Sequence, residues 1–365
     1  MNGVRSSMKA IVTGSGGLIG PECVRLLNEE GWEVVGVDND MRRQFFGAEG
    51  STKATVEDLL QRYPRYRHLS IDVADRNAVR ELLEQERPNF IIHTAAQPSH
   101  DKAAEILHLD FDVNTVGTHN LLVAAHDFCP ESPFVFTSTN KVYGDRPNQL
   151  PLIEKETRFD YAGGREGIDE TMSIDQCLHS PFGASKAAAD LFCQEFGLYF
   201  QMPVGVFRGG CLTGPQQSGV QLHGYLNYIV KCAVEGRPYT IFGYKGKQVR
   251  DQIHARDVAR LFLAFSRNPR CGEVYNMGGG RDNSISVLET VEMLAALDCP
   301  LACTISEKNR KGDHICYISD LGKIRSHFPD WKLEFDVPAI IEQIVEHHRR
   351  PAGKADNFSQ TVSHA

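Results

Sequence analysis

A glycine-rich turn near the start of the chain has the residue types and the spacing to bind a nucleotide phosphate. The segment TGSGGLIG places Gly14, Gly17 and Gly20 between a strand-like run and a helix-like run. Glycines permit a tight turn and close approach of the backbone, and the N-terminus of the following helix attracts a pyrophosphate. We therefore predict a dinucleotide site that includes Leu18 and Ile19, although its G-x-x-G-x-x-G spacing differs from G-x-G-x-x-G.

An acidic residue at the end of the next strand-like run indicates which dinucleotide binds. Asp38 can accept hydrogen bonds from both ribose hydroxyls of NAD, and its charge would repel the 2′-phosphate of NADP. Arg42 and Arg43 follow closely, and an arginine can accommodate that phosphate. The pattern favours NAD as the cofactor, with Asn39 beside Asp38 in the site.

Two further segments are expected to extend the cofactor site. In SIDV, Asp72 and Val73 are placed where they can lie beside the adenine. In HTAAQ, the small side chains of Ala95 and Ala96 leave room for the cofactor at the end of a strand, next to Gln97.

The elements that must position these residues alternate regularly. The segments KAIVTG, EVVGVD, HLSIDV, NFIIHTAA and PFVFTST are typical of buried strands, and helix-like segments separate most of them. Asp75 can cap the helix expected in DRNAVRELLEQERP. Regular alternation predicts an α/β fold, a Rossmann-like doubly wound parallel sheet covered on both faces.

The pattern changes twice along the chain. Residues 144–180 form a polar, turn-rich segment that is too long for a simple connection between two elements. We expect this insert to cover a site. We predict an NAD-binding domain over residues 1–208 and a smaller mixed α/β substrate lobe over 209–350. The tail, residues 351–365, has little to bury and is expected to be disordered.

Composition excludes several classes of protein. The 365 residues carry a net charge of -8, which gives no attraction to nucleic acid or to anionic membranes, and no apolar run is long enough to span a bilayer. The ten cysteines are scattered without a C-x-x-C pair. We therefore expect no metal site, and free thiols in a cytoplasmic protein.

Taken together and in order, these motifs resemble the extended short-chain dehydrogenase/reductase family, which modifies nucleotide-activated sugars. The resemblance runs from Lys9 to Trp331 and adds NTVGTHNLL, TSTNKVYGD, SPFGASKAAAD, GKQVRDQIHARDVA and YNMGGG to the segments above. Within the family the chain is most similar to the CDP-paratose 2-epimerases, through STNKVYGD, LHSPFGASKAAAD, GKQVRD and the long insert.

The resemblance implies a specific chemistry. Tightly held NAD takes a hydride from C2 of a CDP-sugar and returns it to the other face of a transient 2-keto sugar. It also implies a nucleotide-diphosphate sugar as substrate, and a homodimer formed through the helices of GTHNLLVAAHDF and GASKAAADLFCQEF.

Roles follow from the resemblance residue by residue. Thr139 matches the residue that hydrogen-bonds the reacting hydroxyl, and Lys186 matches the lysine that holds the nicotinamide ribose. Asn114 matches an asparagine that supports the active-site helix through backbone contacts, and Arg250 matches an arginine that meets the diphosphate. The remaining substrate-binding candidates are Asn140, Lys247 and His254, of which Lys247 can equally be a solvated lysine and His254 a core histidine.

The chain departs from the family at Phe182, where the pattern Tyr-x-x-x-Lys requires the catalytic tyrosine. Phenylalanine cannot transfer a proton, and loss of a general acid–base group costs about 10²–10⁴-fold in rate. Three explanations stay open: a substitution introduced into an active enzyme, a natural enzyme with another proton relay, or a natural NAD-binding protein without activity. Tyr143, Cys177, His179 and Ser180 are close in sequence, but none is an evident replacement.

The rival functions are separated by the residues after Thr139. A 4,6-dehydratase needs an acid and a base there, whereas this chain has Asn140 and Lys141, which disfavours dehydration. A C4 epimerase of UDP-sugars needs neither and remains an alternative, although the long insert favours C2. A non-catalytic regulator or scaffold that binds NAD is the alternative from a different class.

Overall fold

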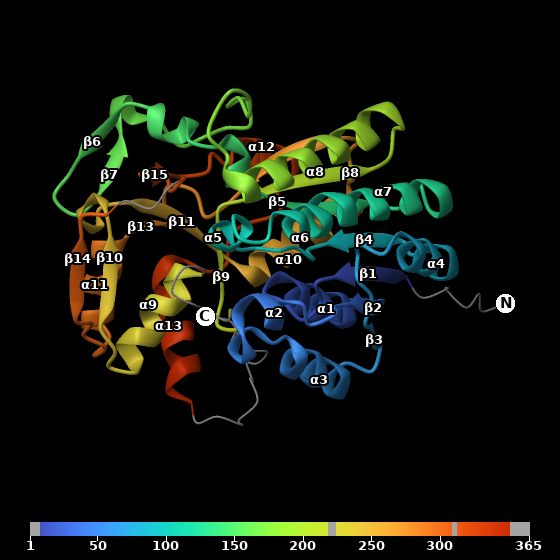
Figure 1. Ribbon diagram of the computed structural model, residues 1–365, viewed down its shortest axis with the longest axis horizontal. Coiled ribbons are helices and arrows are strands. Elements are labelled where there is room, and N and C mark those ends of the chain that lie inside the picture. Colours follow the sequence, from blue (N-terminus) through green and yellow to red (C-terminus); the bar gives the residue numbers. More distant parts are fainter. Residues whose placement is uncertain (1–7, 218–223, 309–311, 351–365) are drawn as a thin grey trace.

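The fold is seen in a computed structural model that describes residues 8–217, 224–308 and 312–350. The tail predicted to be disordered, 351–365, lies outside the described residues. The chain forms a large sheet with helices on both faces and a group of smaller sheets at one end (Figure 1).

The large sheet has seven parallel strands in the order β12-β8-β5-β4-β1-β2-β3. The order reverses direction between β1 and β4, and such a switch point opens a crevice at the carboxyl ends of the strands. This confirms the predicted doubly wound α/β fold. The strands are β1 (Lys9–Thr13), β2 (Glu33–Val37), β3 (Tyr66–Leu69), β4 (Phe90–His93), β5 (Phe134–Thr139), β8 (Val204–Gly209) and β12 (Glu273–Met277).

Helices bury both faces of this sheet, as the β-branched strands require. Successive side chains of a strand point to opposite faces, so Ile11 packs with α4, α7 and α8 while Val12 packs with α1 and α10. Asp75 caps α4 as predicted, accepting hydrogen bonds from the backbone N–H groups of Asn77 and Ala78. The helices on these faces are α1 (Ile19–Glu29), α4 (Arg76–Glu86), α7 (Gly117–Phe128), α8 (Ser180–Tyr199), α10 (Ala255–Arg267) and α12 (Gly322–His327).

Shorter elements surround the carboxyl edge of the sheet. They include a π-helical turn over Asp112–Val116, which joins the end of α6 directly to the start of α7. The short α-helices are α2 (Arg42–Phe46), α3 (Lys53–Arg62), α5 (His100–Ala103) and α6 (Leu107–Phe111). The 3₁₀ turns span Ala48–Gly50, Asn140–Tyr143, Arg146–Gln149, Ala162–Gly164 and Tyr244–Gly246.

In its described residues, 209–217, 224–308 and 312–350, the C-terminal lobe contains two small sheets and three helices that pack apart from the large sheet. One sheet pairs β10 (Tyr239–Phe242) with β14 (Cys303–Ser306), and the other joins β9 (Cys211–Thr213), β11 (Val249–His254), β13 (Ser284–Ser286) and β15 (Cys316–Tyr317). Its helices are α9 (Tyr225–Val234), α11 (Val287–Ala296) and α13 (Val337–Arg349). The expected boundary at 208/209 falls before the last residue of β8, and β12, α10 and α12 return from the later part of the chain to the large sheet.

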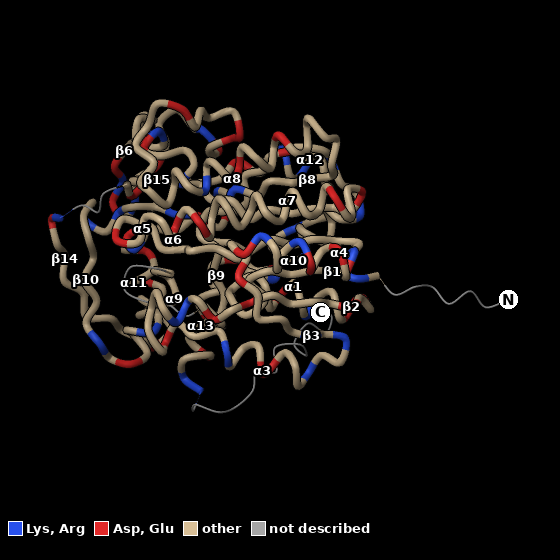
Figure 2. The backbone as a smooth tube through the Cα atoms, turned by 45° about the vertical axis from the view of Figure 1, so that its right-hand side comes forward, with Lys and Arg blue, Asp and Glu red and all other residues tan. Residues whose placement is uncertain are grey.

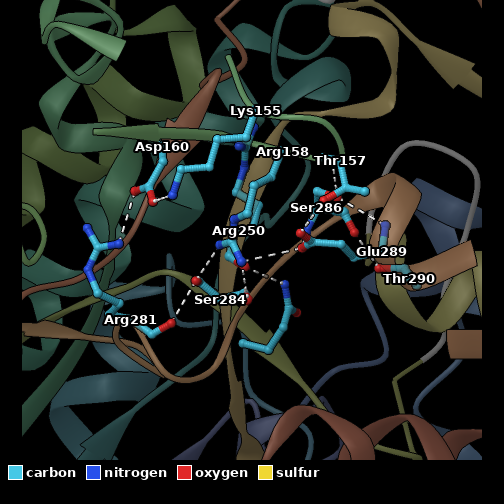
Figure 3. Close-up of polar contacts among 11 residues, drawn as sticks. Lys155, Thr157, Arg158, Asp160, Arg250, Arg281, Ser284, Ser286, Glu289 and Thr290 are labelled. Carbon is cyan, nitrogen blue, oxygen red and sulfur yellow. Dashed lines mark hydrogen bonds and ion pairs between the residues drawn. The ribbon is translucent and has the colours of Figure 1, made fainter. Parts of the chain in front are cut away.

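The insert contains an antiparallel hairpin, β6 (Leu152–Glu154) and β7 (Phe159–Tyr161), that docks on the C-terminal lobe (Figures 1 and 3). Arg158 donates to the hydroxyl of Ser284 at 2.6 Å, and Thr157 donates to the carboxylate of Glu289 at 2.9 Å. Arg281 donates to Asp160 at 3.0 Å. These contacts attach the hairpin to β13, to the start of α11 and to the loop before β13.

Along the backbone, basic and acidic residues are interspersed over both the large sheet and the lobe (Figure 2). None of the helices in the described part of the chain is long and apolar enough to cross a membrane. All ten cysteines are free thiols.

Candidate active site

A pocket of about 400 Å³ lies at the carboxyl ends of the central strands and extends to the C-terminal lobe. It brings together most of the residues singled out in the sequence. Those that line it are Gly14, Gly17, Leu18, Ile19, Asp38, Asn39, Asp72, Val73, Ala95, Ala96, Thr139, Asn140, Phe182, Lys186 and Arg250.

The glycine-rich turn forms one wall of this pocket. Gly14 has a φ of +70°, and a Cβ there would lie 2.8 Å from the backbone nitrogen of Ala95. Gly20 does not line the pocket; a Cβ on Gly20 would collide with the carbonyl of Gly14, so its role is to let α1 start against the turn. No side chain caps the start of α1, which leaves N–H groups directed at the pocket for an anion such as a pyrophosphate. The turn therefore fits the predicted dinucleotide.

Asp38 is fixed on the adjacent wall. Its Oδ2 accepts a hydrogen bond from the backbone of Gly16 at 3.0 Å, and its Oδ1 accepts from Asp40 N and from Thr52 Oγ1, both at 2.9 Å. Gly16 and Thr52 also line the pocket, and neither was predicted from the sequence. Thr52 was missed because it belongs to a separate segment of the chain. Asp38 is thus held at the place where a ribose hydroxyl donor would meet it.

Of the two arginines behind Asp38, Arg42 lines the pocket, whereas Arg43 is exposed and does not. Burial lowers the pKa of Arg42, and the neighbouring Asp38 carboxylate acts in the opposite direction. The wall therefore holds a carboxylate that favours NAD and a guanidinium that suits a phosphate.

We expect Asp38→Asn to shift cofactor preference toward NADP by about tenfold or more, because it removes the charge that repels the 2′-phosphate and leaves Arg42 in place. Calorimetric measurement of the dissociation constants of NAD and of NADP tests this prediction. Asp58→Asn, on α3 and outside the pocket lining, is the matched control and should change neither constant. An unchanged NADP affinity in Asp38→Asn would show that Asp38 does not face the ribose.

The opposite end of the pocket holds the residues expected at the reacting carbon. Thr139 ends β5, and its hydroxyl accepts a hydrogen bond from the backbone N–H of Lys141 at 3.2 Å. Lys186 donates from Nζ to the carbonyl of Thr137 at 2.7 Å and lies 4.1 Å from the ring centroid of Phe136. Burial lowers the pKa of Lys186 to about 8. Phe182 lies one helical turn before Lys186 on α8 and is 7% exposed.

Asn114 and Gln97 lie behind the pocket wall rather than on it. Asn114 Oδ1 accepts from the backbone N–H of Gln97 at 3.0 Å, and its Nδ2 is 3.2 Å from the Ser185 hydroxyl of α8. The hydrogen bond to the α8 backbone comes from Thr115, which donates to the carbonyl of Ser185 at 2.9 Å. Asn114 therefore contacts the backbone at the end of β4 and only a side chain of α8.

A buried carboxylate completes this support and was missed in the sequence. Asp110 accepts hydrogen bonds from the Ser185 hydroxyl at 2.6 Å and from Gln97 Nε2 at 2.7 Å. Burial raises the pKa of Asp110, and the hydrogen bonds act against that rise. It joins α6, the end of β4 and α8, which are far apart along the chain, so only the fold reveals it.

The substrate-binding candidates separate in the structure. Arg250 lines the pocket and forms an ion pair with Asp313 at 2.5 Å. Lys247 does not line it and instead donates to Glu154 and to the carbonyl of Lys155, both at 2.8 Å. His254 also lies outside the lining.

His254 has the environment of a core histidine. Its Nδ1 accepts from the backbone N–H of Arg256 at 3.0 Å and so caps α10, while its ring stacks on Phe335 with centroids 4.2 Å apart. Burial lowers its pKa to about 4.

The residues considered as replacements for the missing tyrosine do not line the pocket either. The Tyr143 hydroxyl is buried, donates to Asn276 at 2.7 Å and accepts from Arg208 at 3.1 Å. Burial raises its pKa to about 12. His179 contacts the thiol of Cys177 and the carbonyl of Val142, on the far side of the turn after β5. Tyr143 is therefore a structural residue.

In open α/β sheets, ligands bind outside the carboxyl ends of the strands, at the switch point where this pocket lies. The fold and pocket are those of a dinucleotide-binding enzyme. The chain belongs to the NAD dependent epimerase/dehydratase family, whose model matches residues 10–278. Membership confirms the predicted cofactor, NAD, at the level of the family.

Individual relatives are nucleotide-sugar enzymes. The chain is 30% identical over 334 residues to the CDP-paratose 2-epimerase of Salmonella typhi, covering 89% of this chain and 94% of the relative. It is 27% identical over 332 residues to dTDP-glucose 4,6-dehydratase 1 of Escherichia coli, covering 86% and 82%. The UDP-glucose 4-epimerase of Thermotoga maritima shares its fold, with a TM-score of 0.76, 24% identity and coverage of 94% and 99%.

Proposed function

We propose that this protein epimerises a nucleotide-diphosphate sugar, specifically C2 of a CDP-hexose of the paratose or tyvelose type. The observation that carries the proposal is that one pocket contains the glycine-rich turn, Thr139, Lys186 and Arg250. A dinucleotide, a reacting hydroxyl and a diphosphate would each meet a suitable group there. Similarity to a CDP-paratose 2-epimerase over most of both chains supports the choice of C2 and of CDP.

The residues after Thr139 support epimerisation over dehydration. Asn140 is an amide, and Lys141 donates from Nζ to the carbonyl of Gly312 at 2.9 Å and lies 3.8 Å from Asp313. Neither can take a ring proton as a carboxylate would. The pocket therefore lacks, at these positions, the acid–base pair that loss of water from the sugar requires.

Each side chain has a distinct task in the proposed reaction. When bound, NAD supplies hydride acceptance and return at one carbon. Thr139 holds the reacting sugar hydroxyl, Lys186 holds the nicotinamide ribose, and Arg250 meets the diphosphate as a planar donor fork. Asn140 lies between Thr139 and Lys141 on the pocket wall, where an amide can hydrogen-bond the sugar.

The experiment that tests this function is incubation of the Phe182→Tyr variant with NAD and either CDP- or UDP-sugars in deuterated water. Epimerised CDP-sugar without solvent deuterium at C2 supports internal hydride return. Deuterium at that carbon indicates deprotonation instead, and turnover of UDP-sugars at C4 alone would favour the C4 epimerase. A variant that binds NAD and converts no sugar nucleotide would favour the scaffold.

We also propose that two copies associate through α7 and α8. On α8 the exposed apolar side chains include Leu191 at 51%, Leu198 at 57% and Tyr199 at 78%, and on α7 Val123 is 38% exposed. The ring of His119 on α7 packs edge-on against Phe192 of α8, with centroids 5.0 Å apart, so the two helices present one joint surface. A second copy that places the same helices here would bury it.

Leu191→Lys should convert the dimer to a monomer, because it places a charge at the centre of the apolar region without removing a core contact. Sedimentation velocity measures the change in mass. Ile305→Lys, an equally exposed apolar position on β14 (59%), is the control and should leave the dimer intact. A monomeric parent chain would contradict the proposal.

The thiols support a cytoplasmic location, which we propose as well. All ten are free, and burial raises the pKa of Cys129 to about 11, which keeps that thiol protonated. Free thiols in this number suit a reducing compartment.

A further inference from the structure

Phe182 provides the ring that the family places beside its lysine, but no group that can carry a proton. We propose that the imidazole of His100 takes that role, with Nε2 accepting the proton of the reacting sugar hydroxyl and later returning it. This inference rests on the proposed epimerisation and assigns a catalytic residue that the family pattern does not contain.

His100 is placed at the pocket by the end of β4. It is the first residue of α5, which Ser99 caps by accepting from the backbone N–H of Lys102. His100 lines the pocket, and its Nε2 is buried without a hydrogen-bond partner among the described residues. On the other side of the ring, Nδ1 lies 3.8 Å from a carboxylate oxygen of Asp101. An imidazole nitrogen that has no hydrogen-bond partner among the described residues, on a side chain that lines the pocket, can accept a proton from a ligand.

Contacts connect this imidazole to the wall that holds Phe182. A Cβ on Gly312 would lie 2.7 Å from His100 Nε2, so the imidazole packs closely against Gly312. The carbonyl of Gly312 accepts from Lys141 Nζ at 2.9 Å. The carbonyl of Lys141 in turn packs against Gly183, the residue after Phe182, where a Cβ would lie 2.8 Å from it. His100 is therefore linked through Gly312 and the side chain of Lys141 to the wall that carries Thr139 and Phe182.

The other ionisable residues at this end are less suited to accept a proton. Lys186 is fully charged well below pH 8, since burial lowers its pKa only to about 8, and it already donates to Thr137. Burial raises the pKa of Cys211 to about 11 and raises the pKa of Tyr225 well above its ordinary value, so both keep their protons.

The remaining charged groups are already engaged. Arg250 and Lys141 carry no free lone pair, and the carboxylate of Asp313 lies between them, 2.5 Å from Arg250 and 3.8 Å from Lys141. Among the described lining residues at this end, His100 is thus the side chain that offers an uncommitted basic nitrogen.

The proton and the hydride leave together, so the step balances without a further reagent. When bound, NAD would supply the acceptance and return of the hydride at the sugar carbon. The electron pair of the sugar O–H bond would form the C=O bond, and the hydroxyl proton would bind His100 Nε2. The return step reverses each change on the other face of the sugar. In this scheme Phe182 contributes only apolar contact to the sugar and the cofactor.

The test compares His100→Gln in the parent chain and in the Phe182→Tyr variant, with NAD and CDP-glucose or CDP-paratose. In the parent chain, kcat should fall by about 100-fold or more while KM changes by less than about threefold, as expected for a lost proton relay. In Phe182→Tyr the same substitution should cost less than about fivefold, because the phenol then carries the proton. The matched control is His108→Gln, which replaces an exposed histidine on α6. It should change neither kcat nor KM in the parent chain or in the Phe182→Tyr variant.

A second readout does not depend on turnover. The imidazole NMR signals that disappear in His100→Gln should shift when CDP-glucose is added to the NAD-bound parent chain, and those of His108 should not. Equal loss of kcat in both backgrounds, or signals that do not move, would overturn the role of His100. Turnover by the Phe182→Tyr variant without any turnover by the parent chain would also contradict the role of His100, but it would still support the proposed epimerisation. No turnover by either chain would reject the epimerisation itself.

Discussion

Phe182→Tyr should raise the turnover number of CDP-sugar epimerisation by about 10²-fold, and by up to about 10⁴-fold if the parent has no efficient proton relay. The substitution adds a hydroxyl to a ring already placed on the pocket wall, one helical turn from Lys186. The positive charge of Lys186 would lower the pKa of the new phenol and so help it accept a proton. Steady-state rates on CDP-glucose and CDP-paratose measure the gain.

The control for the phenol is Phe182→Leu, which removes the ring and adds no hydroxyl, and it should bring no gain. If His100 carries the proton in the parent chain, the gain from the tyrosine should be larger in the His100→Gln background. A Phe182→Tyr variant that binds NAD and CDP-sugar with parental affinity but gains less than about threefold in rate would contradict a proton-transfer role for this position.

Lys186→Met should stabilise the protein at pH 7 by up to about 3 kcal/mol while it weakens NAD binding. Burial holds the pKa of Lys186 at about 8, below its ordinary 10.5, so at neutral pH the folded state contains a costly buried charge. Asp190 and Asp110 offset part of this cost. Methionine fills similar volume without charge, and the lost hydrogen bond to Thr137 makes 3 kcal/mol an upper value.

The pH dependence of this gain has a definite sign. Because the folded pKa is lower than the unfolded one, the unfolded chain binds more protons between pH 8 and 10.5, and the parent gains stability as pH rises through that window. The advantage of Lys186→Met should therefore be full below about pH 8 and absent above about pH 10.5. Urea unfolding at pH 7 and pH 10.5 measures it, and Lys332→Met, on the surface, is the control. A destabilised variant at pH 7 would contradict the prediction.

The sheet and the glycine-rich turn could be predicted because their determinants are local. Val12 and Ile11 belong to a continuous apolar run that needs cover on both faces, and Gly14 is followed directly by the helix it serves. Apart from Gly16, which belongs to the glycine-rich turn itself, the residues that were missed have the opposite property. Asp110, Thr52 and His100 acquire their environment from segments remote in the sequence, which periodicity cannot bring together.

Position within one motif also proved a poor guide to position in the pocket. Arg250 lies inside β11 and lines the pocket, whereas Lys247 precedes the strand and turns toward the hairpin of the insert. His254 ends the same strand, where capping α10 takes its Nδ1. The chain direction changes at both ends of a short strand, so neighbours of a site residue need not point the same way.

The insert was expected to cover the site, and that remains a prediction for the substrate-bound protein. In the structure, none of the residues of 144–180, all of them described, lines the pocket. Its hairpin instead contacts the C-terminal lobe through Thr157, Arg158 and Asp160. A sequence can show that a connection is too long, but the surface on which it folds is decided by side chains elsewhere, here Ser284, Glu289 and Arg281.

The hairpin at Lys155–Asp160 has a consequence for attempts to recombine this protein with its relatives (Figure 3). A chimera that exchanged only the part of the chain after residue 208 would bring in a foreign α11 and β13 beneath a native hairpin, and Arg158 would lose its acceptors on Ser284 and Glu289. A chimera intended to change the sugar preference would therefore have to exchange the hairpin together with the later segment. Chimeras that exchange the later segment without the hairpin should yield insoluble protein, even where both starting proteins fold well.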